Sequence, residues 1–335
     1  MTSRLARLAA PAAAIACGLA ALSATAQEVP EVYQDETLRI MTSNGPGGGF
    51  DFYMRTTGKH LEEIFGIDVA EQNVDGAGGT IGDNQLYMAD PDGLTIGLIN
   101  FPGHVFNQIQ GHPGVQYDVA NWEWLGRVAG VPPALAVSAD SDLESLADAI
   151  DSAEPVRFGL EGRGSDAYYG TVFLANLLGM PVEQIVGYGG PGEISAALIA
   201  GEVDARFESI DTLLPEVENG TLKILVLFDT EADPRAPDLP TLGDTGLDAE
   251  TTAKLEAFAN IYKLERSFVA PPDTPDDRVA FLRDALMAVF TSDAYAAELE
   301  AAGRALQPMD GATLQEEAGK VAAQVEDLAP LFAEE

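Results

Sequence analysis

Cysteine, histidine and basic residues are scarce in this 335-residue chain. Its one cysteine, Cys17, lies near the N-terminus, so disulfide and thiol chemistry are excluded from the rest of the chain. Lysine and arginine together number 18 against 54 aspartates and glutamates, and the formal net charge is −36. A surface this acidic repels nucleic acids and anionic lipids. The composition therefore excludes nucleic acid as a partner, and it favours solubility in concentrated salt.

Catalytic motifs are also missing. His60 is expected at the surface or edge of a helix, and His104 and His112 flank a Gly/Pro-rich turn with a spacing that fits no metal site. Neither the G-x-S-x-G elbow nor the G-x-x-x-x-G-K-[ST] phosphate loop occurs. No metal, cofactor or catalytic residue is predicted. Carboxylates are abundant, so an exported hydrolase that uses a carboxylate pair stays open as an alternative.

Long apolar runs are confined to the first 26 residues. Two arginines precede an alanine-rich apolar stretch, 8–22, and the triplet 24–26 has the small-x-small pattern of a cleavage site. We therefore predict that residues 1–26 are a signal peptide, cleaved after Ala26, and that the mature chain is periplasmic without inserting into the membrane. A lipoprotein signal would need a large apolar residue three positions before Cys17, and Ala14 stands there.

Glycine is abundant where predicted strands meet predicted helices. The segment 43–51 holds four glycines and Pro46 between an apolar strand-like stretch and residues that recur at helical spacing. Such a loop directs backbone N–H groups and the positive end of a helix dipole at one place, which suits an anion. A tight turn would explain this loop equally well on its own. A second loop of the same kind, 73–80, favours the anion site.

A dinucleotide-binding loop is the first rival interpretation. Gly45 and Gly47 fit the start of its fingerprint, and Glu71 lies where an acid that binds ribose would be expected. Phe50, however, occupies the third glycine position, and its bulk would disturb the close packing of helix on strand. The predicted export also argues against a soluble nicotinamide enzyme.

Strand–loop–helix units follow one another along the whole chain. The expected strands are 38–41, 67–71, 94–99, 124–128, 134–137, 156–160, 185–188, 203–207 and 222–228, with a strand-like stretch at 258–270. The expected helices are 50–65, 81–89, 143–150, 166–178, 193–200 and 275–290, followed by two more, with a turn at 100–103. The last of the numbered helices is expected to have Thr274 as its N-cap and Pro275 at its first position.

This order predicts an α/β protein with two lobes, each a mostly parallel sheet flanked by helices. Residues 229–245 are rich in proline and acids and are expected to lead the chain back to its first lobe. Lobe 1 would comprise 27–127 plus 250–335, and lobe 2 would comprise 128–249. Ligands bind such sheets at the carboxyl ends of their strands, where both glycine loops lie.

The ordered motifs resemble the solute-binding proteins of tripartite tricarboxylate transporters, the Bug/TctC-like family. The matching segments are 46–51 with Arg55, 76–82, 91–93, 164–165, 187–190, 201–204, 239–242 and 270–275. The resemblance implies a two-lobed periplasmic binding protein, a Venus flytrap without catalysis. Such a protein would capture a small organic acid and deliver it to membrane permease subunits. A ligand-capturing partner of a sensor would share this fold and site, so that alternative stays open.

The resemblance also implies the ligand-binding residues. In the family the two first-lobe loops hold one carboxylate through backbone N–H groups and ordered water. Carried onto this chain, the ligand-binding residues are Ser43, Asn44, Gly47, Gly48, Gly49, Asp51, Ala77, Gly78, Gly79, Thr80, Ser165, Tyr168, Gly189 and Glu208. Because close approach to the anion needs glycine, Gly48→Val and Gly78→Val are both expected to abolish binding.

The second lobe departs from the family pattern. Tyr168 stands where the family often has histidine, Glu208 where aspartate is common, and Gly189 where lysine is common. The distal end of the ligand therefore cannot be carried over. Tyr168 would donate its hydroxyl or stack on an aromatic acid, or else pack as a helix surface residue. Arg163 is a candidate second cationic contact.

Overall fold

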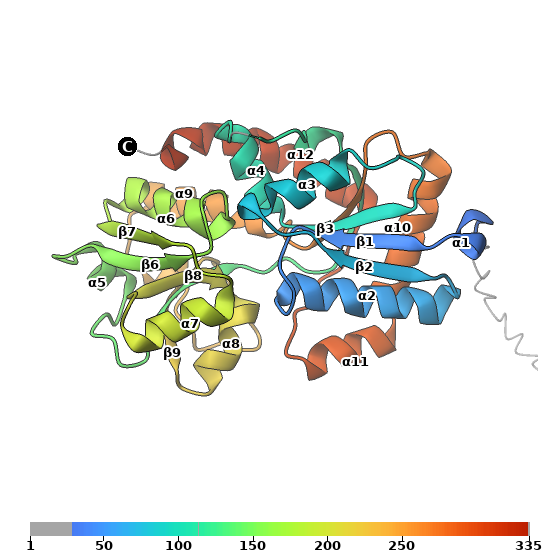
Figure 1. Cartoon of the computed structure of the whole chain (residues 1–335). Coiled ribbons are helices and arrows are strands. Elements are labelled where there is room, and N and C mark those ends of the chain that lie inside the picture. The colour runs from blue at the N-terminus through green and yellow to red at the C-terminus, as the bar shows by residue number, and fades with distance from the viewer. Residues whose placement is uncertain (1–28, 113, 334–335) are drawn as a thin grey trace, which may run out of the picture.

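The computed structural model describes residues 29–112 and 114–333, and it confirms the predicted two-lobed α/β architecture. One lobe, to the right in Figure 1, contains the first three strands, and the other contains β5 to β9. We call them the first and second lobes. The predicted signal peptide, its cleavage site and Cys17 lie outside the described residues. None of the helices within the described ranges has the length and apolar character needed to span a membrane.

The first lobe is built on a six-stranded sheet. Its strands, in spatial order, are β11 (Met309–Asp310), β4 (Glu123–Arg127), β10 (Ser267–Ala270), β3 (Thr95–Ile99), β1 (Leu38–Thr42) and β2 (Val69–Asn73). Strand β1 pairs in parallel with β2 and β3, as the succession of strand–loop–helix units predicts. Strand β10 returns antiparallel between β3 and β4, and β11 pairs antiparallel with β4. All five residues of the central β3 are buried.

The second lobe is built on a five-stranded sheet. Its strands, in spatial order, are β7 (Val182–Val186), β6 (Val156–Leu160), β8 (Ala205–Ser209), β5 (Pro133–Ser138) and β9 (Leu222–Leu227). Strand β6 is parallel to β7 and β8, whereas β5 is antiparallel to β8 and β9. Both sheets are therefore mixed, not mostly parallel as the sequence predicted, because the strands next to the chain crossings return antiparallel. Its helices are α5 (Leu146–Ile150), α6 (Asp166–Leu178), α7 (Pro191–Ala200) and α8 (Ile210–Glu218).

The remaining helices flank the first lobe or join the two lobes. They are α1 (Val32–Asp35), α2 (Gly49–Phe65), η1 (Ala77–Gly79), α3 (Thr80–Tyr87), α4 (Phe101–Ile109), η2 (Val119–Asn121), η3 (Leu242–Asp244), α9 (Ala249–Tyr262), α10 (Asp276–Phe290), α11 (Asp293–Ala301), α12 (Gly311–Leu328) and η4 (Ala329–Phe332). Helix α2 spans the predicted range almost unchanged, and it ends at Gly66 in the left-handed conformation.

An aromatic cluster joins the lobes. The ring of Phe258, on α9, stacks on Phe173 of α6 at 4.4 Å between centroids and also lies near Phe106 of α4. The ring centroid of Phe332 lies 4.5 Å from that of Phe106 and 5.1 Å from that of Phe173. Helix α9 and the C-terminal η4 therefore pack on both lobes. The predicted division of the chain at residues 127/128 and 249/250 stays a prediction.

Two chain crossings between the lobes lie side by side. A β-carbon built on Gly130, in the first crossing, would lie only 2.6 Å from the carbonyl oxygen of Lys263 in the last one. The guanidinium of Arg127 spans the same region, donating to the carbonyls of Lys263 and Gln307. Glycine is therefore required at 130, because any side chain there would push the crossings apart.

Three segments differ from the sequence predictions. The expected turn at 100–103 is the start of α4, in which Pro102 is accommodated in the first turn and Asn100 accepts from Gly103 N–H as N-cap. The expected strand at 258–270 is helix α9 followed by the short β10, since its apolar residues at 255, 258, 259 and 262 follow helical spacing. Helix α8 was not expected; it carries Pro215 inside.

Two histidines and the N-cap of α10 also differ from the sequence predictions. His104 lies inside α4 rather than beside a turn, and His60 is only 3% exposed rather than at the surface. Pro275, not Thr274, is the N-cap of α10; the Thr274 hydroxyl donates to the carbonyl of Pro271.

Candidate functional site: two glycine loops and the facing lobe

The first glycine loop joins β1 to α2, as expected. Gly47 has φ = 84°, and its N–H donates to Asp51 Oδ2 at 2.9 Å. The other carboxylate oxygen of Asp51 accepts from Arg55 Nε at 2.8 Å. Asp51 thus holds its own loop in shape. Gly48 is the N-cap of α2, so the N–H groups that follow belong to the first helical turn and are not used by the helix itself.

The first residues of that loop tie it to its neighbours. Asn44 accepts at its carbonyl from Asn73 Nδ2 at 3.0 Å, which connects the ends of β1 and β2. Ser43 is buried, and its hydroxyl would lie 3.2 Å from a β-carbon built on Gly79. The two loops are therefore adjacent at the carboxyl ends of their strands, as the parallel sheet predicts.

The second glycine loop has a continuous run of positive φ angles. They are 122° at Gly76, 51° at Ala77, 65° at Gly78 and 94° at Gly79. Ala77 adopts this conformation at some cost because it carries a β-carbon. Thr80 then begins α3; it is 3% exposed, and its Oγ1 has no hydrogen-bond partner among the described residues. A buried hydroxyl without a partner at the start of a helix is available to donate to an acceptor.

The second lobe lies directly against this loop. A β-carbon built on Gly78 would be 2.8 Å from the carbonyl oxygen of Arg163 and from the carbonyl carbon of Gly164. Asn107 of α4 donates to the Gly164 carbonyl at 3.0 Å, and Asn100 donates across the lobes to Asp166 Oδ1 at 3.1 Å. The predicted loops of the two lobes are thus brought together.

The second-lobe residues that were predicted to bind the ligand differ from one another in burial and in hydrogen bonding. Ser165 caps α6: its hydroxyl accepts from Tyr168 N–H at 3.2 Å and donates to the Gly162 carbonyl at 3.0 Å. Tyr168 is 2% exposed, with the Arg163 guanidinium carbon 5.7 Å from its ring centroid, so it is no helix surface residue. Gly189 is exposed, and its N–H already donates to the Glu193 carboxylate at 2.7 Å.

Glu208 lies at the end of β8, where its carboxylate is held in place. One oxygen accepts from Ser209 N–H at 2.9 Å, and the other lies 3.2 Å from Arg206 Nη2. Burial raises the pKa of Asp166 to about 6, and the nearby Glu208 carboxylate raises it as well. Burial also raises the pKa of Glu265, against the opposing effect of Arg266.

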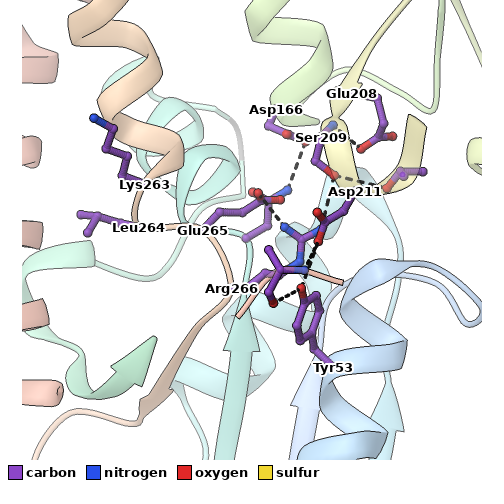
Figure 2. Close-up of polar contacts among 12 residues, drawn as sticks. Tyr53, Asp166, Glu208, Ser209, Asp211, Lys263, Leu264, Glu265 and Arg266 are labelled. Carbon is purple, nitrogen blue, oxygen red and sulfur yellow. Dashed lines mark hydrogen bonds and ion pairs between the residues drawn. The ribbon is translucent and has the colours of Figure 1, made fainter. Parts of the chain in front are cut away.

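Arg266 is a central residue that the sequence reasoning missed. It is 1% exposed, and it donates to Glu265 at 2.9 Å and to the Ser209 hydroxyl at 3.3 Å (Figure 2). Its guanidinium also faces the rings of Phe50 and Tyr53, with centroids 5.2 and 5.1 Å from its central carbon. Its backbone has a positive φ of 55°, which is unusual for a residue other than glycine but cannot be read from the sequence.

Arg266 reaches the first glycine loop as well. Its Nη2 would lie 2.9 Å from a β-carbon on Gly49, so it connects the start of α2 with the end of β8. Beside it, the Tyr53 hydroxyl lies 2.6 Å from the Ala305 carbonyl and 3.0 Å from Asp211 of α8. The second glycine loop therefore contacts the second lobe directly, through Gly78. The first glycine loop contacts it through Arg266.

Two cavities lie away from these loops. One of about 580 Å³ is lined by residues of 36–41 and 85–95, and one of about 220 Å³ lies between 229–242 and 256–263. Neither is lined by a glycine-loop residue, so the candidate site rests on the loops themselves. Across the described ranges, no group of three or more His, Cys, Asp or Glu side chains is arranged to hold a metal ion.

Residues 53–327 match the profile of the family described as "Tripartite tricarboxylate transporter family receptor", TctC. The chain belongs to this family. Its members are periplasmic solute-binding proteins, which agrees with the two-lobed fold and confirms the resemblance noted from the sequence motifs. The match begins after the first glycine loop and includes the second.

Individual relatives are more distant. Protein BugT of Bordetella pertussis is 27% identical over 222 residues, which are 64% of this chain and 68% of that protein. Among solved structures, MatC from Rhodopseudomonas palustris with bound malate superposes with a TM-score of 0.72 at 21% identity, covering 88% of this chain and 98% of that one. Rpa4515 of the same organism, with adipate, has a TM-score of 0.74 at 21% identity, covering 88% and 97%. At this identity, the solved structures establish the fold of this TctC-family chain.

Proposed function

We propose that this TctC-family protein captures a small organic acid in the periplasm and delivers it to the permease subunits of a tripartite transporter. The observation that carries the proposal is the pair of adjacent glycine loops, with the unpartnered Thr80 hydroxyl at the start of α3. Both loops lie at the carboxyl ends of parallel strands, where ligands bind in α/β sheets. Malate and adipate in two structural neighbours support a carboxylate as the ligand.

The carboxylate would be held by fixed dipoles. The N–H groups at the start of α2 and the Thr80 hydroxyl at the start of α3 are its donors, with Ser43 and the glycines of both loops forming the contact surface. Each charge-assisted hydrogen bond contributes roughly 1.5–3 kcal/mol. Repulsion from distant surface carboxylates is screened beyond about 8–10 Å at ordinary salt. A strongly acidic protein can therefore bind an anion at this place.

A thermal-shift panel of mono-, di- and tricarboxylates and aromatic acids tests the proposal. At a ligand concentration of about 100 Kd, binding stabilises the folded state by about 2.7 kcal/mol, which raises Tm by several degrees. We expect at least one acid to do so and to be recovered unchanged by NMR. Conversion of a stabilising acid would establish the hydrolase instead, and a flat panel would contradict carboxylate capture.

Delivery is tested separately in cells. Deleting the gene for this protein should abolish uptake of the radiolabelled acid found in the panel, and the intact gene should restore it. Normal uptake in the deletion strain would leave capture standing and contradict the role in transport. N-terminal sequencing of the protein purified from the periplasm should begin at Gln27.

A further inference from the structure

A buried histidine and a buried aspartate lie behind the second glycine loop. His104, inside α4, and Asp83, in the first turn of α3, are 1% and 3% exposed. His104 Nε2 lies 3.1 Å from Asp83 Oδ1. The other carboxylate oxygen of Asp83 would lie 3.4 Å from a β-carbon built on Gly79, so Asp83 packs directly against the loop.

The geometry places a proton on each ring nitrogen of His104. Nδ1 lies 2.7 Å from the Asn100 carbonyl oxygen, which can only accept, so Nδ1 carries a proton. In a neutral ring Nε2 would then direct a lone pair at the Asp83 carboxylate, and the two would repel each other. The first turn of α3 favours the charged form of Asp83, so the proton belongs to the imidazole.

This contact is an ion pair by distance and not an aligned hydrogen bond, since His104 Nε2 has no hydrogen-bond partner among the residues described. An imidazolium at this place gives the buried Asp83 a counter-charge, which a buried carboxylate needs. Breaking such a pair by removing one partner is costly, because the other charge stays buried.

The ring and hydrogen-bond contacts of His104 otherwise involve neutral groups within the described part of the chain. The ring centroids of Tyr117 and Trp122 lie 4.8 and 6.3 Å from that of His104. Burial raises the pKa of Tyr117, so its hydroxyl stays neutral. On the facing α6, Asp166 is separated from His104 by Asn100. The charge of His104 is therefore set against that of Asp83.

His104 also connects the second glycine loop with the second lobe. The Asn100 carbonyl accepts from the His104 ring, and the Asn100 side chain donates to Asp166 Oδ1 at 3.1 Å. A continuous path of contacts thus runs from Gly79 through Asp83 and His104 to the start of α6.

We propose that His104 is a positioning residue, an imidazolium that holds the second glycine loop through Asp83 and faces it to the second lobe through Asn100. Loss of its proton leaves Asp83 buried without a counter-charge, so the start of α3, with Thr80, moves. Capture of the acid therefore weakens as the pH rises through the titration of His104. The effect on capture rests on the proposed function, whereas the protonation and the loop position do not.

Nitrogen-15 spectra of the ligand-free protein test the protonation. The chain has three histidines, which are assigned with the single variants His60→Gln, His104→Gln and His112→Gln. We expect both ring nitrogens of His104 to carry protons at pH 7.5. In Asp83→Asn, where no charge retains the second proton, Nε2 should be unprotonated at the same pH. A neutral His104 ring in the wild type would overturn the proposal.

The backbone amide signals of Gly79 and Thr80 report the position of the loop. Between pH 7 and pH 10 they should shift with the same midpoint as the His104 ring, and this step should be absent in His104→Gln. His60→Gln is the matched control, because His60 is also 3% exposed and lies 2.9 Å from a Glu298 oxygen, but on α2 and α11. It should keep the step. Constant amide signals in the wild type, or a step that persists in His104→Gln, would contradict the loop's dependence on His104.

Calorimetric titration with malate and adipate connects the loop with capture. At pH 7.5, His104→Gln should bind the tighter of the two acids at least ~5-fold more weakly than the wild type, because the broken pair displaces the loop. His60→Gln should stay within ~2-fold, since distant sites act independently. Equal affinities in all three proteins would overturn the positioning role. If neither acid binds the wild type, capture of these acids is contradicted, and the ring and amide spectra still decide the protonation and the loop position.

Discussion

At the scale of single residues, the glycines of the two loops are not equivalent. Gly48 has an ordinary φ of −84°, and a β-carbon there would meet nothing closer than the Gly45 carbonyl at 4.0 Å. Gly78 has φ = 65°, and its β-carbon would collide with the backbone of the facing lobe at 2.8 Å. The expectation that Gly48 and Gly78 are equally sensitive to substitution is therefore refined to a difference between them.

Gly78→Ala and Gly48→Ala make a matched pair that tests this difference. Gly78→Ala should weaken binding of the captured acid at least ~10-fold, because the methyl group adds left-handed strain and separates the lobes. Gly48→Ala should change the affinity by less than ~3-fold, since its methyl group points into open space. Calorimetric titration of both variants provides the measurement. Equal losses would show that the contact of Gly78 with Gly164 has no part in binding.

Whether a residue of the site could be predicted depends on how far away in the sequence its contacts lie. The two glycine loops were predictable because each is a local pattern of strand, glycines and helix. Arg266 was not, because its partners, at residues 50, 53 and 209, are distant in sequence and come together only when the lobes assemble. Asp166 was missed for the same reason, since nothing local shows its contact with Asn100.

At the scale of elements, helix α6 depends on the cap that Ser165 provides. The Ser165 hydroxyl satisfies the Tyr168 N–H in the first turn, and the same turn places the 162–164 loop against Gly78. Ser165 was predicted as a ligand-binding residue; the hydrogen bonds show that it also has this structural task.

Ser165→Ala should lower the free energy of unfolding by about 1 kcal/mol, as the loss of an N-cap does. It should also weaken ligand binding, because the loop that faces Gly78 loses its anchor. Ser145→Ala is the control: Ser145 caps the short α5 in the same way, so it should lower stability without affecting affinity. Urea unfolding and ligand titration give the two quantities. A Ser165→Ala variant that binds normally would separate the cap from the site.

Elements were predictable where their signals are strong and local. Helix α2 has an apolar face, a glycine loop before it and Gly66 after it. The end of helix α9 was predicted as part of a strand, 258–270, because its apolar residues there run on toward the apolar β10; the helical spacing shows only when residue 255 is included. The Pro102 and Gly103 pair suggested a turn at the start of α4, yet both residues suit a first helical turn.

At the scale of the whole molecule, the net charge of −36 opposes the compact state. Raising NaCl from about 0.01 M to about 1 M shortens the screening length from about 30 Å to about 3 Å. We therefore expect Tm to rise by several degrees over this range. Choline chloride at equal ionic strength should give the same rise, because screening does not depend on the cation. A constant Tm, or a rise with sodium alone, would contradict this explanation.

The C-terminal η4 adds a consequence for the order of folding. The Phe332 ring completes an aromatic cluster whose other members, Phe106, Phe173 and Phe258, come from α4, α6 and α9. The junction between the lobes therefore cannot be finished until Phe332 has been synthesised. Contacts between such distant parts of a chain form slowly. For a chain that is exported, as proposed, this delay keeps the nascent polypeptide incompletely folded while it awaits translocation.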